Sequence, residues 1–160
     1  MRSIVVYGSR SGNTRRIAEV IAGVLQSRGA VDLLPAEEAP AAFPTDTDLV
    51  VVGGPTEAHG ITPPVVGFFE RLAPNSLKGI HAAAFDTRLH VPRLLSGSAA
   101  SGIARRLRAL GGTVIVPEES FMVSREPQLE AGEIERAEDW ATFLVNAIEA
   151  KLPALAASAR

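Results

Sequence analysis

A short polar segment, residues 9–14 (SRSGNT), carries the clearest chemical signal in the sequence. Hydroxyl or amide side chains occupy four of its six positions, and Gly12 gives the backbone freedom to turn. An apolar run precedes the segment and an amphipathic run follows it, so its N–H groups are expected at the start of a helix. Such N–H groups, with hydroxyls and the positive end of the helix dipole, bind anions such as phosphate.

The same residues exclude other well-known loops. A P-loop requires a lysine after its last glycine, but Gly12 is followed by Asn13. Residues 8–12 do not supply the dinucleotide pattern G-x-G-x-x-G, and Arg10 stands where a G-x-S-x-G nucleophile elbow needs serine. The remaining alternative to a phosphate site is a plain helix cap made by Ser11 or Asn13.

Composition is that of a globular protein and excludes several functional classes. Of the 160 residues, 46% are hydrophobic and 21% charged, which are ordinary values. The formal net charge of -2 gives no reason to expect nucleic acid or an anionic membrane as a partner. The chain has no cysteine, which excludes disulfides, thiol nucleophiles and iron–sulfur clusters. No metal site is predicted.

The apolar runs are short. None approaches the roughly 20 residues of a membrane span, so no membrane insertion is predicted. Near the N-terminus only four apolar residues follow one another, at positions 4–7, which is too short for the apolar core of a signal peptide. A cytoplasmic location is therefore predicted.

These runs alternate with helical patterns along the chain. Strands are predicted at residues 4–7, 31–34, 49–52, 80–85 and 113–116, and the best of them are apolar on both faces. Helices are predicted where apolar residues recur three and four positions apart, at residues 17–25, 65–72, 103–110 and 134–148. Glycines follow the first and third helices, and Pro63-Pro64 precedes the second.

This alternation predicts an α/β protein with a doubly wound, three-layer fold around a five-stranded parallel sheet. A single domain over residues 1–152 is expected, followed by a frayed tail at 153–160. Ligands of such folds bind at the carboxyl ends of the strands. Chemistry is therefore expected in the loops at residues 8–14, 53–62 and 86–99.

All three loops resemble those of the flavodoxin family. SRSGNT (9–14) is similar to the flavodoxin phosphate loop, T/S-x-T/S-G-x-T. GGPTEAHG (53–60) resembles the loop that flanks the flavin, which often contains G-x-P-T, and Asp86-Thr87 resembles the start of the third flavin loop. The similarity extends over roughly residues 3–150 and implies the strand order 2-1-3-4-5.

The resemblance implies that the chain binds flavin mononucleotide (FMN). The first loop would wrap the 5'-phosphate, and the second and third loops would flank the ring, with Asp86 accepting a hydrogen bond from it. The implied cofactor-binding residues are Ser9, Arg10, Ser11, Gly12, Asn13, Thr14, Pro55, Thr56, Glu57, His59, Gly60, Asp86 and Thr87.

The chain departs from the family in its aromatic residues. Many flavodoxins place the flavin between a Trp in the second loop and a Tyr in the third. Here Trp140 lies in the last predicted helix and Tyr7 ends the first strand, and the second loop offers only His59. Part of the stacking energy is then lost, so weaker flavin binding is predicted.

Three functions remain open. The leading interpretation is an FMN-binding electron-transfer protein whose redox partner is unidentified. The second is an FMN-dependent NAD(P)H:quinone oxidoreductase, and the third is a flavin-free interaction module that kept the fold. No Ser–His–Asp set or carboxylate dyad stands out, so no catalytic residue is predicted.

Overall fold

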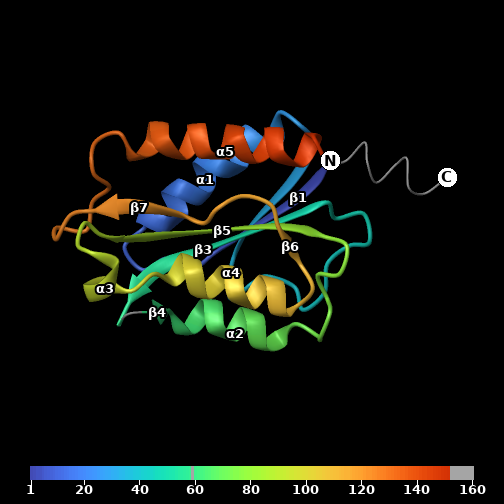
Figure 1. Ribbon diagram of the computed structural model, residues 1–160, viewed down its shortest axis with the longest axis horizontal. Helices are drawn as coiled ribbons and strands as arrows, with labels where there is room; N and C mark the ends of the chain where they lie inside the picture. Colours follow the sequence, from blue (N-terminus) through green and yellow to red (C-terminus); the bar gives the residue numbers. More distant parts are fainter. Residues whose placement is uncertain (59, 152–160) are drawn as a thin grey trace.

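The computed structural model describes residues 1–58 and 60–151 and arranges them as a central sheet between two layers of helices (Figure 1). The parallel strands of the sheet are β1 (Arg2–Tyr7), β2 (Ala30–Pro35), β3 (Leu49–Glu57), β5 (His81–Leu89), β6 (Thr113–Val114) and β7 (Glu119–Val123). The helices of the two layers are α1 (Asn13–Gln26), α2 (Pro63–Arg71), α4 (Ala99–Ala109) and α5 (Glu133–Glu149). The predicted tail, 153–160, lies outside the described residues.

The predicted strand order is confirmed. β2, β1, β3 and β5 lie side by side in parallel, and β6 and β7 share the fifth position beside β5. A short strand that was not predicted, β4 (Gly60–Ile61), pairs antiparallel with the end of β3. The chain therefore has the expected doubly wound fold, with one added hairpin at the carboxyl end of the sheet.

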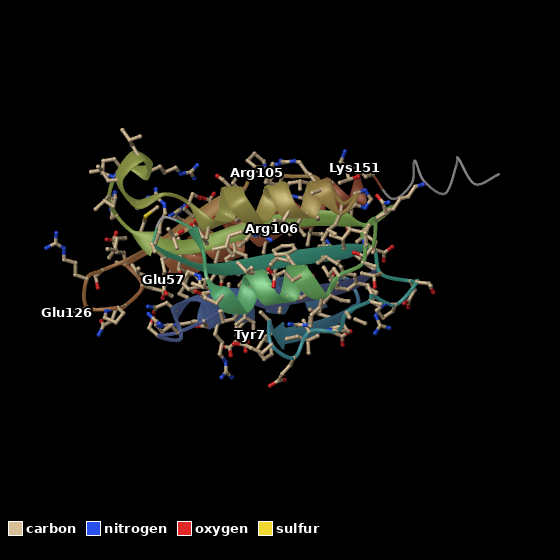
Figure 2. The ribbon with its side chains drawn as sticks, turned by 90° about the horizontal axis from the view of Figure 1, so that it is seen from below. Tyr7, Glu57, Arg105, Arg106, Glu126 and Lys151 are labelled. Atoms are coloured by element: carbon tan, nitrogen blue, oxygen red, sulfur yellow. The ribbon has the colours of Figure 1, made fainter. Side chains whose placement is uncertain are left out.

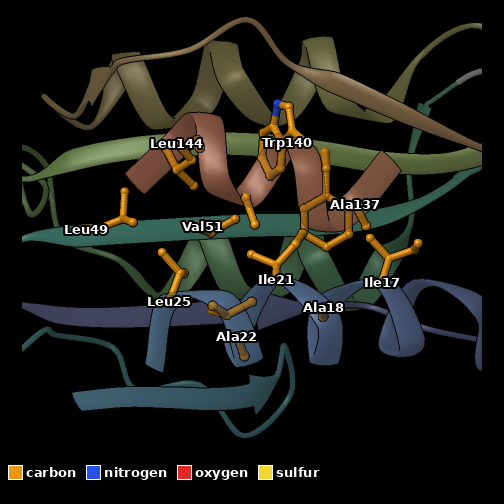
Figure 3. Packing of buried hydrophobic residues seen from close by; sticks show 14 of the residues in the cluster. Ile17, Ala18, Ile21, Ala22, Leu25, Leu49, Val51, Ala137, Trp140 and Leu144 are labelled. Atoms are coloured by element: carbon orange, nitrogen blue, oxygen red, sulfur yellow. The ribbon is translucent and has the colours of Figure 1, made fainter. Parts of the chain in front are cut away.

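Each face of the sheet buries its own hydrophobic cluster. On one face α1 packs beside α5, and Figure 3 shows Ile21 of α1, Trp140 of α5 and Val51 of β3 in the same cluster. On the other face α2 and α4 contribute Phe68 and Ile103. Among the described residues, no helix combines the length and the apolar character needed to cross a membrane.

The third and fourth predicted strands are longer than expected. β3 runs to Glu57 and β5 to Leu89, and their pairing continues through Gly53↔Phe85 to Pro55↔Thr87. The predicted loops 53–62 and 86–99 therefore begin inside strands. The apolar pattern stops early because two glycines and a proline follow Val52, although the backbone pairing does not stop there.

The fifth predicted strand, 113–116, is interrupted. Two residues pair with β5 as β6, and pairing resumes at Glu119 in β7. Pro117 in the intervening segment lacks a backbone N–H, so it cannot donate to the ladder. A second unpredicted element, the short helix α3 (Arg93–Ser96), lies within the third predicted loop.

A glycine substitution tests how closely β3 approaches β5. A Cβ atom at Gly53 would lie 2.1 Å from the Phe85 ring. Gly53→Ala is therefore expected to lower the free energy of unfolding by about 2–3 kcal/mol, as overpacking does. In α1, a Cβ at exposed Gly23 would meet nothing within 4 Å. The control Gly23→Ala should therefore gain about 0.5–1 kcal/mol in urea unfolding. Equal effects of the two substitutions would contradict this account.

Candidate functional site

The structure brings the three predicted loops together at the carboxyl end of the sheet, where α3 and β4 also lie (Figure 1). The Gly8 N–H donates to the carbonyl of Gly53 at 2.9 Å, which joins the first loop to β3. Figure 2 shows Glu57 and Glu126 at this end of the molecule, far from Lys151 at the other end. This edge of the sheet is therefore the candidate site.

The phosphate-loop segment forms a tight turn into α1. Gly12 is the N-cap, with a φ of 90° and no side-chain cap. The backbone N–H groups of Gly12 and Arg15 both point at the hydroxyl oxygen of Ser9, at 3.2 and 3.4 Å. The alternative that Ser11 or Asn13 caps the helix is therefore wrong, because Gly12 holds that position and the acceptor is Ser9.

Asn13 ties the loop to a distant segment instead. Its side-chain amide donates to the Ser11 hydroxyl at 3.2 Å and to the carbonyl of Pro127 at 2.8 Å. The next turn of α1 carries an exposed ion pair, since Arg15 donates to Glu19 at 2.8 Å. That hydrogen bond and the charge of Glu19 raise the pKa of Arg15. The side chain of Arg15 thus points along α1, while its N–H faces the loop.

A buried hydrogen bond connects the first loop to the third. The hydroxyls of Thr14 and Thr87 lie 2.7 Å apart, and both side chains are buried. Thr87 belongs to β5, so α1 begins directly beside the carboxyl end of the sheet. Two predicted site residues that are 73 positions apart in the chain are therefore in contact.

The second predicted loop lines a cleft of about 250 Å³ together with the first. Its walls include Ser9 and Arg10 on one side and Pro55 and Glu57 on the other. Arg10 and Glu57 form an ion pair at 3.4 Å across it. Because the Arg10 side chain is 81% exposed, this pair adds little stability.

Beyond Glu57 the chain reverses direction into β4. Glu57 pairs with Gly60, and Ala58 has a φ of 45°, a left-handed conformation that is uncommon for alanine. Gly60 itself is half-buried in β4. His59, the predicted ring neighbour, lies outside the described residues.

Asp86 is fully buried and organises the start of α4. Its Oδ2 oxygen accepts hydrogen bonds from the hydroxyls of Thr56 and Ser98, both at 2.9 Å, and from the N–H of Ala100 at 3.0 Å. Ser98 is the N-cap of α4, and its hydroxyl accepts a hydrogen bond from the N–H of Ser101. The Oδ1 oxygen is buried and has no partner among the described residues. The contact of Asp86 with a flavin ring stays a prediction.

Arg88, which was not among the predicted site residues, is only 8% exposed. It lines a cavity of about 230 Å³ with Thr56 and Ala58 on one side and residues of 89–96 on the other. The sequence could have placed Arg88 beside Asp86, because it follows Asp86 by two positions and alternate residues of a strand share a face. This was not predicted, because the predicted strand ended at residue 85, before both residues.

The aromatic residues lie where the sequence placed them. Trp140 packs edge-on against Phe85 and Phe121, in the core between the sheet and α5. Tyr7 is half-buried and packs against the same cluster. The third loop instead exposes two leucines of α3, Leu94 and Leu95. Neither Trp140 nor Tyr7 is positioned to cover a ligand in the cleft.

Comparison with known proteins identifies the family. The flavodoxin-domain family matches residues 4–91, more than half of the chain, and the chain therefore belongs to this family. No curated protein matches the sequence.

Several solved structures share the fold at low sequence identity. A flavodoxin from the domain Archaea is 22% identical, with a TM-score of 0.73 over 93% of this chain and 99% of that one. Flavodoxin 2 from Bacillus cereus is 22% identical, with a TM-score of 0.78 over 94% and 99% of the two chains. Rubredoxin oxygen:oxidoreductase from Desulfovibrio gigas is 20% identical, with a TM-score of 0.76 over 94% of this chain but 37% of that one. At these identities the likeness establishes the fold.

The role of Asp86 in holding α4 can be tested by an isosteric substitution. Asp86→Asn removes the charge and turns one acceptor into a donor, so about 2 kcal/mol of unfolding free energy should be lost. Asp46→Asn is the control, because its side chain is 68% exposed and pairs with Arg2 at 3.6 Å. That variant should change stability by less than about 0.5 kcal/mol in urea unfolding. A similarly small loss at Asp86 would contradict the structural role.

Proposed function

We propose that the chain is an FMN-binding electron carrier. Its family supports a flavin-binding role in electron transfer. The observation that carries the proposal is the convergence of two N–H groups, from Gly12 and Arg15, on the Ser9 hydroxyl. Distances of 3.2 and 3.4 Å are long for such bonds, and Ser9 is a neutral acceptor. A phosphate oxygen is charged and accepts from these donors more strongly.

The donor set of the loop suits a phosphate monoester. The exposed hydroxyls of Ser9 and Ser11 add donors beside the N–H groups, and Arg10 adds a positive charge. The N-terminal dipole of α1 favours the same sign of ligand charge. Thus the residues present fit the phosphate of FMN without the lysine of a P-loop.

The residues that would hold the flavin ring are those that the flavodoxin resemblance implies, namely Pro55, Thr56, Glu57, His59, Gly60, Asp86 and Thr87. When bound, FMN supplies the redox chemistry, and the chain binds and orients it. Because the loops lack the usual Trp and Tyr, the ring would pack against aliphatic side chains of residues 89–96 instead of stacking on aromatic rings.

Two further predictions belong to this proposal. Residues 1–152 are proposed to form one domain, because the described strands join a single sheet. A cytoplasmic location also stays a prediction.

The proposal is tested by titrating the purified chain with FMN and with riboflavin, followed by flavin fluorescence. FMN is expected to bind with a Kd of about 1 μM or tighter, near -8 kcal/mol. Riboflavin lacks the phosphate and its charge-assisted hydrogen bonds, so it should bind at least about a hundredfold more weakly. An FMN Kd of about 1 mM or weaker would overturn the proposal.

A pair of serine variants locates the phosphate. Ser11→Ala removes a hydroxyl from the loop and should weaken FMN binding by about tenfold while leaving riboflavin unchanged. Ser27→Ala, at the other end of α1, is the matched control, because its hydroxyl donates to the Val24 carbonyl. Equal FMN affinities in the two variants would place the phosphate elsewhere.

Turnover distinguishes a carrier from an enzyme. A carrier loaded with FMN should not oxidise NAD(P)H with a quinone unless a reductase is added. Steady NAD(P)H oxidation by the loaded chain alone would identify the oxidoreductase alternative. A chain that binds no flavin would support the interaction module.

A further inference from the structure

Arg88 keeps a positive charge inside the protein without an ion pair to the described residues. Its side chain is 8% exposed. One Nη atom donates to the Val91 carbonyl at 2.8 Å and to the Ser96 hydroxyl at 3.0 Å, while the buried Nε has no partner among residues 1–58 and 60–151. A buried charge held only by neutral groups is costly. Such an arrangement is typical of an arginine whose positive charge pairs with a negative charge on a bound ligand.

Asp86 is the carboxylate that shares this face of β5, but it does not neutralise Arg88. Its Oδ2 oxygen already accepts three hydrogen bonds, from Thr56, Ser98 and Ala100. Glu57 is paired across the cleft with Arg10. Neither acid forms an ion pair with Arg88, so its positive charge stands beside the separate negative charge of Asp86 without being bound to it.

The place of Arg88 relative to the phosphate loop is fixed by its neighbour. Thr87 contacts Thr14, so Arg88 lies one residue beyond the junction with α1. From there it lines the cavity of about 230 Å³ between the end of β3 and the segment 89–96. The walls of this cavity come from the second and third predicted loops, which would flank the flavin ring.

We propose that Arg88 binds the negatively charged edge of the reduced flavin and so raises its midpoint potential. This inference rests on the proposed function. Oxidised FMN has a neutral ring; two electrons and one proton convert it to a reduced ring with one negative charge, delocalised over the pyrimidine half. A fixed guanidinium stabilises that anion and leaves the neutral oxidised ring almost unaffected.

The inference is tested by measuring the midpoint potential of the FMN-loaded chain, with dithionite as the reductant and a dye of known potential as the reference. Arg88→Gln should weaken binding of reduced FMN relative to oxidised FMN by about tenfold, which lowers the potential by about 30 mV for a two-electron couple. Arg88→Lys keeps the positive charge but not the planar guanidinium. The midpoint potential of this variant should therefore lie between those of the unaltered chain and Arg88→Gln.

A matched control removes the same charge elsewhere. Arg105 is exposed on α4 (Figure 2), and Arg105→Gln should leave the potential unchanged. If Arg88→Gln binds FMN and has the potential of the unaltered chain, the inference is overturned and the proposed function stands. If the unaltered chain binds no FMN, both are overturned.

A further measurement needs no substitution. The absorption spectra of neutral and anionic reduced flavin differ, so the dithionite-reduced chain can be examined under mildly acidic conditions in which free reduced FMN is neutral. The anionic spectrum is expected, because Arg88 favours loss of that proton. A neutral spectrum would overturn the inference even if the Arg88 variants failed to fold.

Discussion

The parallel pairing of β3 with β5 is the constraint on which the rest of the structure depends. The pairing continues past the apolar runs of both strands to Pro55↔Thr87, and it is possible only because Gly53 leaves room for the Phe85 ring. Hydrogen bonds between the two strands, rather than a hydrophobic pattern, extend β3 and β5 to the carboxyl end of the sheet. As a result Thr56 lies beside Asp86, and the second and third loops share one site.

The buried polar groups behind this edge fix the site from both sides of the sheet. On the α4 side, the Asp86 carboxylate joins β5 to Thr56 of β3 and to Ser98 and Ala100 at the start of α4. On the α1 side, Thr87 holds Thr14. Buried polar networks of this kind are costly when incomplete and give a single arrangement when satisfied. The loops are therefore mounted on elements whose relative positions are set by hydrogen bonds as well as by the two hydrophobic clusters.

The electrostatics of the site combine separate charges that do not neutralise each other. Asp86 and Arg88 stand on one face of β5, yet the acid is bound to α4 and the arginine to the Val91 carbonyl and the Ser96 hydroxyl. The proposed phosphate loop, with its N–H donors, lies on the α1 side, where Thr87 contacts Thr14. A ligand with a phosphate at one end and a ring that gains negative charge on reduction complements both regions. Because the loops lack the usual aromatic residues, the binding of the flavin ring would then depend on charge more than on stacking.

The sequence by itself determined the fold class, because apolar periodicity is a local signal that needs no knowledge of distant residues. The strand order came from the resemblance of SRSGNT and the two later segments to flavodoxins, and the structure confirms it. The sequence did not determine where β3 and β5 end, the interruption after β6, or the burial of Arg88. Those features depend on pairing between segments about 30 residues apart. The apolar pattern is broken by glycine and proline in β3 and before β7, and by the polar residues 86–88 in β5. Only the tertiary structure decided that Ser9, rather than Ser11 or Asn13, receives the loop N–H groups, since that choice follows from the left-handed turn at Gly12.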